Sequence, residues 1–320
     1  MYQIKPLFFL SLISFLFCCT PKNNLPTIAY VDAFEDNTIA KAKDGFFDAL
    51  QKNGFSEKQK TINILYRNAQ GNIPTLTQII QYFKSEKVTC IASCPSISTI
   101  TALQNVKNIP VFMVVSPVPE LMKINSKNNV TPSNLFGVGE NLSYINTSFG
   151  LIPKLLKKKK NLKVGMIYNQ SEPQSVDALD HIKMLAVNYN IELIYLPVNS
   201  SAETQLVTQS LLSKNIDAFF ANPDNVVFAS FETIIQACNA ANVPVFTSEA
   251  GLVARGAVAA YGADMYQWGY QVGEQASIFL KTKSTKNLQW EMVKLRKKVY
   301  NEKVAQQFGI TVEQGFEKIN

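Results

Sequence analysis

Two short stretches of the 320-residue chain place polar side chains directly after a buried apolar run. The first, Val88–Ser96, reads VTCIASCPS, and the second, Asp217–Asn225, reads DAFFANPDN. A helical pattern follows each stretch, and similar apolar runs come next, IPVF from Ile109 and VPVF from Val243. A strand that ends in a polar turn before a helix puts those residues at the carboxyl edge of a parallel sheet, where open α/β sheets bind ligands. The repeat therefore predicts two copies of one unit that face each other across a binding site.

The polar residues at these two turns fit the charged ends of a free amino acid. A carboxylate favours backbone N–H groups at a helix N-terminus together with hydroxyls. Ser93, Cys94, Pro95 and Ser96 are our candidates for that role. An ammonium group requires a carboxylate, and Asp224 at the opposing turn is the first candidate. The alternative for both turns is an ordinary helix N-cap, because a helix follows each of them.

Further candidates stand at other predicted strand ends. Asp264 is the second choice for the ammonium partner, and Glu249 and Glu172 are weaker choices. Phe34 and Tyr168 could form an aromatic wall for the ligand's side chain, although an aromatic residue at a strand end more often belongs to the core. The remaining polar candidates are Glu35, Ser116, Asn169, Ser171 and Asn225.

Catalytic chemistry finds little support in the sequence. His181 is the one histidine, and its place inside a helical pattern argues against a Ser-His-Asp triad or a His-rich metal site. Neither a P-loop nor a complete GxGxxG motif is present, and neighbouring carboxylates such as Glu35 and Asp36 are common by chance. The three cysteines beyond the N-terminal region lack metal-ligand spacing. We therefore expect a binding protein and not an enzyme, with no metal and no cofactor.

The composition is that of a well-packed globular protein long enough for two domains. Hydrophobic residues make up 47% of the chain and charged residues 17%, unlike a disordered segment. The net charge of +7 is spread along the chain apart from the run Lys157–Lys160. That run has no interleaved aromatic or Arg residues, so we interpret it as a solvated helix end and expect no nucleic-acid partner.

The N-terminus has the pattern of an exported, lipid-anchored protein. Lys5 precedes an apolar run over residues 6–17, which is too short to span a bilayer comfortably and suits a signal peptide. Cys18 and Cys19 follow, and a polar stretch comes next. We expect residues 1–18 to be a signal peptide, Cys19 to be acylated, and residues 19–26 to tether the protein to the membrane. A plain cleaved signal and an uncleaved anchor are the alternatives.

Strand-like runs alternate with helical patterns of about 10 to 15 residues, which predicts an α/β fold with parallel sheets built from βαβ units. We expect two Rossmann-like lobes with a hinged cleft between them. The first lobe would comprise residues 27–139 and about 248–275, and the second residues 140–247 and about 276–320.

Several short motifs occur in the same order as in a known family. The resemblance to that family covers roughly residues 27–315. The family is the type I periplasmic binding proteins of ABC importers, specifically the aromatic amino-acid-binding lipoproteins. The motifs, besides the turn after Val88–Ala92, are Tyr66–Gly71, Ile109–Phe112, Val164–Asn169, Asn222–Asn225, Val243–Phe246 and Arg255–Asp264.

The resemblance implies a periplasmic-binding-protein-like fold whose lobes close by hinge motion on a small amino-acid-like ligand. It also implies delivery of that ligand to an ABC permease in the membrane, driven by a separate ATPase. An aromatic ligand is implied by the resemblance alone. A sensory binding protein of the same fold is the first alternative, and an enzyme on that fold is the second.

Overall fold

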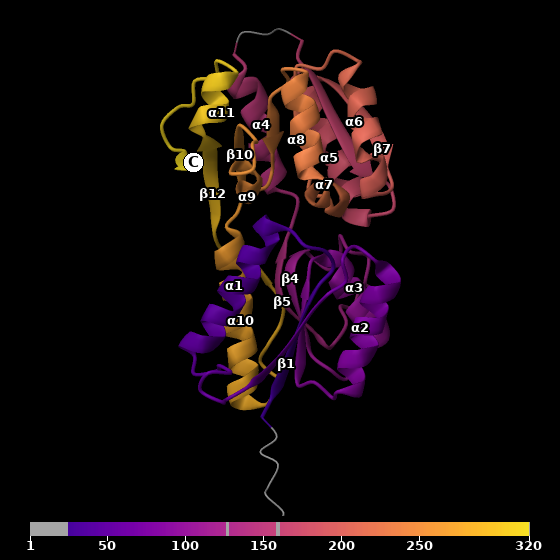
Figure 1. The fold of residues 1–320 in the computed structure, drawn as a ribbon, viewed down its shortest axis with the longest axis vertical. Coiled ribbons are helices and arrows are strands. Elements are labelled where there is room, and N and C mark those ends of the chain that lie inside the picture. The colour runs from indigo at the N-terminus through magenta and orange to yellow at the C-terminus, as the bar shows by residue number, and fades with distance from the viewer. Residues whose placement is uncertain (1–24, 126–127, 158–160, 320) are drawn as a thin grey trace, which may run out of the picture.

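The computed structural model describes residues 25–125, 128–157 and 161–319, which form two lobes joined by crossing segments (Figure 1). Each lobe holds one mainly parallel sheet with helices packed on it. This confirms the predicted α/β fold with two parallel sheets. The predicted signal peptide and Cys19 lie outside the described residues. Within the described ranges, no helix combines the length and apolarity needed to cross a membrane.

The sheet of the first lobe has the strand order β11-β5-β4-β3-β1-β2, and its neighbouring strands are parallel. Helices α1 and α10 pack together on one face, and α2 and α3 cover the other (Figure 1). The strands are β1 (Thr27–Asp32), β2 (Asn63–Asn68), β3 (Cys90–Cys94), β4 (Val111–Pro117), β5 (Leu135–Glu140) and β11 (Glu291–Met292). The helices are α1 (Asn37–Lys52), α2 (Ile73–Ser85), α3 (Ser96–Asn105) and α10 (Met265–Thr282).

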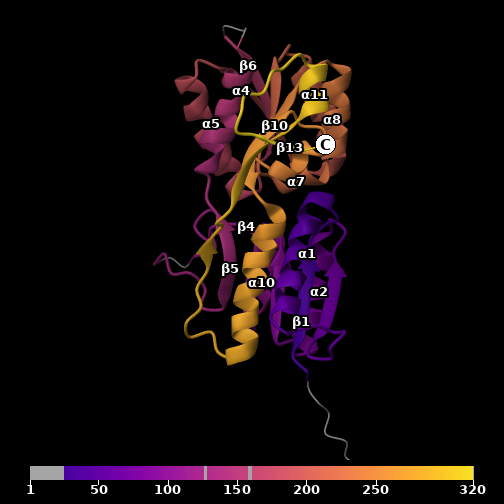
Figure 2. The ribbon, with the colours of Figure 1, turned by 90° about the vertical axis from the view of Figure 1, so that its left-hand side faces the viewer.

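Helix α10 belongs to the first lobe although it follows strands of the second lobe in the chain. It runs beside α1 (Figure 2), and two glycines allow the close approach. A Cβ on Gly269 would lie 1.7 Å from the carbonyl oxygen of Ala42, and a Cβ on Gly45 would lie 2.0 Å from that of Tyr266. Backbone of one helix therefore touches backbone of the other, which no larger residue would permit.

The sheet of the second lobe has the order β13-β12-β10-β9-β8-β6-β7, with only the β10–β12 pair antiparallel among the described strands. Its strands are β6 (Lys163–Asn169), β7 (Glu192–Val198), β8 (Ala218–Ala221), β9 (Val245–Thr247), β10 (Ala259–Ala263), β12 (Arg296–Asn301) and β13 (Glu317–Ile319). Its helices are α4 (Tyr144–Leu155), α5 (Pro173–Asn188), η1 (Ser201–Glu203), α6 (Thr204–Leu212), α7 (Asn225–Ala229), α8 (Phe231–Ala240), α9 (Ala250–Val253) and α11 (Glu302–Gln307).

The predicted lobe boundaries need correction in the last quarter of the chain. The sequence places residues 248–275 in the first lobe, but β10 pairs with β9 through Ala259 and Phe246 and lies in the second. The sequence places residues 276–320 in the second lobe, but the rest of α10 packs on α1, and β11 pairs with β5 through Glu291 and Val138. The chain crosses after β5, between β10 and α10, and between β11 and β12. An amphipathic pattern shows that an element has a buried face, but not which sheet buries it.

Candidate functional site

A cavity with an empty volume of about 510 Å³ lies between the lobes, where strands of both sheets end. This is the place expected of a small-molecule site. The first lobe lines it with Ile39, Pro95, Ser96, Val115, Ser116, Pro117 and Trp268, and the first crossing segment with Glu140 and Asn141. The second lobe lines it with Leu142, Tyr144, Gln174, Pro223, Asp224, Asn225, Phe228 and Glu249.

The two lobes touch each other around this cavity. The amide of Asn225 donates to Ser96 Oγ at 3.1 Å, and the amide of Gln174 donates to the same oxygen at 3.3 Å. Arg255 of the second lobe pairs with Asp36 at the start of α1. These contacts join residues of opposite lobes across the mouth, so the structure is in a closed arrangement.

The wall from the first lobe is the start of α3 and the end of β4. Helix α3 has no side-chain cap, because Pro95 stands at its N-cap position. An uncapped helix start leaves backbone N–H groups available to an anion. Behind it, Ser93, Thr99 and Ser116 form a chain of buried hydroxyls, with oxygen–oxygen distances of 2.9 Å and 3.1 Å. Ser93 and Cys94 thus support the wall from within, and Ser96 and Ser116 reach the cavity.

Asp224 lies at the cavity edge but is fully engaged by its own lobe. One carboxylate oxygen accepts from the N–H groups of Val226 and Val227, at 2.8 Å and 3.1 Å, and so caps α7. The other accepts from the N–H of Asn169 at 2.6 Å and the hydroxyl of Ser175 at 2.5 Å. Burial raises the pKa of Asp224, and these four donors oppose that shift. The sequence offered two interpretations of Asp224, a helix N-cap and a site residue. In the structure Asp224 is an N-cap that also borders the cavity.

Glu172 lies beside Asp224 and organises the amides around the mouth. It accepts from Asn169 Nδ2 at 2.9 Å, from Gln174 Nε2 at 2.6 Å and from the N–H of Asn225 at 3.2 Å. Desolvation and then the charge of Asp224 raise the pKa of Glu172. Asn169 and Glu172 therefore position Gln174 and Asn225, the two amides that bridge to Ser96.

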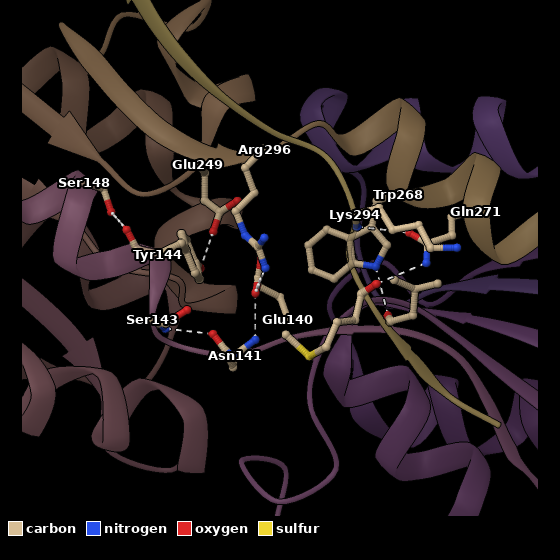
Figure 3. Close-up of polar contacts among 12 residues, drawn as sticks. Glu140, Asn141, Ser143, Tyr144, Ser148, Glu249, Trp268, Gln271, Lys294 and Arg296 are labelled. Atoms are coloured by element: carbon tan, nitrogen blue, oxygen red, sulfur yellow. Dashed lines mark hydrogen bonds and ion pairs between the residues drawn. The ribbon is translucent and has the colours of Figure 1, made fainter.

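Glu249 is the carboxyl of the cavity with the fewest strong donors (Figure 3). It is 4% exposed, and one oxygen accepts from the hydroxyl of Tyr144 at 2.9 Å. Burial raises the pKa of Glu249 most. The hydrogen bond from Tyr144 lowers it, the charge of Glu140 raises it again, and the resulting pKa is about 8. Glu140 itself is held by Arg296 through two contacts of 2.6 Å and 2.7 Å. Glu249 is therefore a buried acid that gains from a cation placed beside it.

The aromatic wall is made by residues that the sequence did not single out. Trp268 is 4% exposed and donates from Nε1 to the carbonyl of Val138 at 2.9 Å, which fixes its ring (Figure 3). Tyr144 and Phe228 of the second lobe also line the cavity. Trp268 lies four residues after Asp264, inside the helical pattern of α10. Its large aromatic side chain was the only feature of the sequence that could have pointed to a role in the site. Rings held at this position can line an apolar compartment.

The structure does not bring every predicted site residue to the cavity. Phe34 packs against the core and Glu35 is exposed, and neither lines the cavity. Tyr168 packs against Tyr195 at a ring distance of 6.1 Å, and Ser171 is exposed. Asp264 caps α10 and pairs with Lys297 at 3.0 Å. Predicted residues that line the cavity are Pro95, Ser96, Ser116, Asp224, Asn225 and Glu249.

Comparison with known proteins agrees with this arrangement. A tyrosine-binding protein of Clostridioides difficile (strain R20291) is 31% identical over 250 residues, or 78% of this chain and 71% of that protein. A solved conserved domain protein of Vibrio cholerae matches with a TM-score of 0.83 at 26% identity, over 92% of this chain and 99% of its own.

Two further structures bear on the closed arrangement. A domain of Streptococcus pneumoniae in complex with L-Trp has a TM-score of 0.82 at 20% identity. The ligand-free, open structure of a substrate-binding protein of Clostridium difficile has a TM-score of 0.66 at 25% identity. Each covers 92% of this chain and 99% of its own. The lower score of the open structure, despite its higher identity, agrees with the contacts between the lobes.

A family model described as ABC transporter substrate binding protein matches residues 27–318. That range contains the described elements of both lobes except the last residue of β13. The chain therefore belongs to the family of ABC transporter substrate-binding proteins, the extracytoplasmic components that bind a solute for such a transporter.

Proposed function

We propose that the solute is a free L-amino acid with an aromatic side chain, bound in the cavity between the lobes. The observation that carries the proposal is the buried Glu249 carboxyl beside an aromatic wall, opposite an uncapped helix start. These are the three features that an ammonium group, a ring and a carboxylate require. The name of the 31% identical tyrosine-binding protein and the L-Trp complex support the choice of an aromatic ligand.

In this proposal the ligand's ammonium group pairs with Glu249 and not with Asp224. Asp224 already accepts four hydrogen bonds, two of them from the backbone of the helix that it caps. A fifth donor would have to displace one of these. Glu249 has hydroxyl partners only, so a cation completes its coordination and offsets the cost of burying its charge.

The ligand's carboxylate faces the start of α3, where N–H groups and the amides of Gln174 and Asn225 are within one small region. Gln174 and Asn225 now donate to Ser96 Oγ and come from the other lobe. A carboxylate there would accept from donors of both lobes at once. Such a ligand binds the closed form better than the open form, which is the condition for driving closure.

We further propose that Cys19 is acylated after removal of residues 1–18 and that the closed protein docks on an ABC permease. The support is the sequence pattern around Cys19, because these residues lie outside the described ranges. Metabolic labelling with a fatty-acid analogue tests the first part. Label is expected in the wild type and in Cys18→Ala, and its persistence in Cys19→Ala would contradict the assignment.

Binding is tested by calorimetry on residues 20–320, which contain all the described elements and include the part that matches a solved structure over 99% of that structure's chain. Tyr, Trp and Phe are compared with Leu, Lys and Glu. We expect the aromatic amino acids to bind at least ten times more tightly than Leu. Glu249→Gln should weaken that binding, and Asp264→Asn, at a carboxyl outside the cavity, should not. Tight binding of Lys or Glu without any response to Tyr, Trp or Phe would overturn the assignment.

A further inference from the structure

The connections that lead into the parallel strands of the first lobe lie at the end of that lobe that points away from the cavity. Strands β1 to β5 and β11 all start at this edge, because their neighbours are parallel. The segments that lead into four of them are residues 53–62, 86–89, 106–110 and 283–290. These segments and the first residues of β1 are called the basic end here, for the charges that they carry.

The basic end has a strong excess of positive charge. Its four segments carry the exposed side chains of Lys58, Lys60, Lys87, Lys107, Lys283 and Lys286, and the only acids among them are Glu57 and Glu86. The segments come from four separate parts of the chain. The excess therefore depends on the fold and does not appear as a run of basic residues in the sequence.

Helix capping explains only part of this charge. Helices α1, α2, α3 and α10 end at this edge, and a lysine near a helix C-terminus interacts favourably with the last carbonyls. Lys107 does so, donating to the carbonyl of Leu103 at 2.6 Å. Among the described residues, however, the side chains of Lys58, Lys87 and Lys286 form no hydrogen bond and no ion pair.

Some lysines at the opposite end of the molecule do have acidic partners. Lys154 and Lys157 both pair with Glu313, at 3.1 Å and 2.6 Å, and Lys163 pairs with Glu192 at 3.4 Å. The charges of Lys58, Lys87 and Lys286 have no such partner among the described residues and are left for an external one.

The chain enters the first lobe at the basic end. Strand β1 begins at Thr27, whose N–H donates to Thr89 of segment 86–89 at 3.0 Å, and β1 starts toward the bottom of Figure 1. Eight residues separate Cys19 from Thr27, and an extended chain spans at most about 3.6 Å per residue. A lipid on Cys19 would hold this end within roughly 30 Å of the bilayer.

We propose that the basic end rests on the anionic phospholipid headgroups of the membrane that carries the protein. The first lobe then lies next to the membrane, and the cavity and the second lobe lie farther out along the long axis of Figure 1. This inference does not depend on which ligand the cavity binds. The proposed lipid on Cys19 only brings the basic end close to the membrane, and a protein that lacks Cys19 tests the basic end by itself.

The experiment measures co-sedimentation of residues 20–320 with phosphatidylcholine vesicles, with and without phosphatidylglycerol, at low and high salt. A matched pair of triple variants separates local from net charge. Lys58→Glu, Lys87→Glu and Lys286→Glu alter the basic end, whereas Lys214→Glu, Lys298→Glu and Lys303→Glu alter exposed lysines of the second lobe by the same total charge.

The wild type and the second-lobe variant should bind vesicles that contain phosphatidylglycerol, and salt should weaken that binding because it screens exposed charges. A lysine at an anionic surface changes affinity about fivefold, so the basic-end variant should bind at least ~100-fold more weakly. Equal loss in both variants would show a net-charge effect and overturn the proposal. Equal binding to vesicles with and without phosphatidylglycerol, or no binding to either, would do the same.

Discussion

The pKa of Glu249 makes amino-acid binding depend on pH. Without ligand, burial moves this pKa to about 8, so the carboxyl is mostly protonated at pH 7. A ligand ammonium group pairs with the ionised form. Binding below pH 8 therefore requires Glu249 to lose a proton, and affinity should rise as the pH rises toward 8 and then level off.

The size of the effect follows from the shift. Ionising a group two pH units below its pKa costs about 2.7 kcal/mol, at about 1.36 kcal/mol per unit. The dissociation constant should thus fall roughly 50-fold between pH 6 and pH 8, because half of the carboxyls are still protonated at a pH equal to the pKa. Near pH 6.5 each bound ligand should release close to one proton, which appears in calorimetry as a dependence of the binding enthalpy on the buffer.

Two variants identify the group responsible. Glu249→Gln keeps the size of the side chain and an acceptor for Tyr144 but cannot ionise. It should bind the ligand about 30- to 5,000-fold more weakly at pH 8, since loss of one partner of a buried charged pair costs about 2–5 kcal/mol. Its binding should also no longer vary between pH 6 and pH 8.

Glu172→Gln is the matched control, because burial raises the pKa of Glu172 too while its bonds go to Asn169, Gln174 and Asn225. This variant should retain the pH dependence. The other groups that face Glu249 are Tyr144, Ser248 and Glu140, and Glu140 is neutralised by Arg296. A pH dependence that survives in Glu249→Gln and disappears in Glu172→Gln would refute the assignment.

Three further changes test the rest of the structure. Glu249→Gln should raise the melting temperature of the ligand-free protein at pH 8. A carboxyl whose pKa in the folded state lies above the unfolded value of ~4.3 makes the protein less stable as the pH rises from ~4.3 to 8, by up to about 5 kcal/mol. An unchanged melting temperature would place the pKa of Glu249 near its ordinary value. Asp224→Asn should lower the unfolding free energy by about 2–4 kcal/mol in denaturant titrations, because it sets an amide against N–H donors; loss of binding with wild-type stability would instead make Asp224 a direct ligand. Arg255→Met should weaken binding about 3- to 10-fold by removing a contact between the lobes, seen as a larger radius in small-angle scattering. Glu232→Gln, which breaks only the bond of Arg255 within the second lobe, should leave the radius unchanged.

The sequence was informative about the fold because the signals for it are local. Apolar runs such as Val88–Ala92 and the turn at Asn222–Asn225 mark strand ends directly, and the family match over residues 27–318 confirms the resemblance drawn from them. The lobe of α10 was not predictable in that way. Its place depends on Gly269 meeting the backbone of Ala42, a contact between residues far apart in the chain.

The choice between Asp224 and Glu249 shows where local signals end. Both residues follow a buried strand at the same edge of one sheet, and the sequence favoured Asp224 and ranked Glu249 below it. What separates them is the number of donors around each carboxylate. Asp224 precedes a helix whose first N–H groups it caps, and Ser175 and Asn169 approach it from neighbouring elements. The carboxylate of Glu249 accepts from the hydroxyl of Tyr144 in α4. A carboxylate whose oxygens are already occupied by donors of its own fold has no free position for a ligand, whereas one left short of donors is kept protonated until a cation arrives. Availability for a ligand is thus a property of the surroundings that tertiary contacts create.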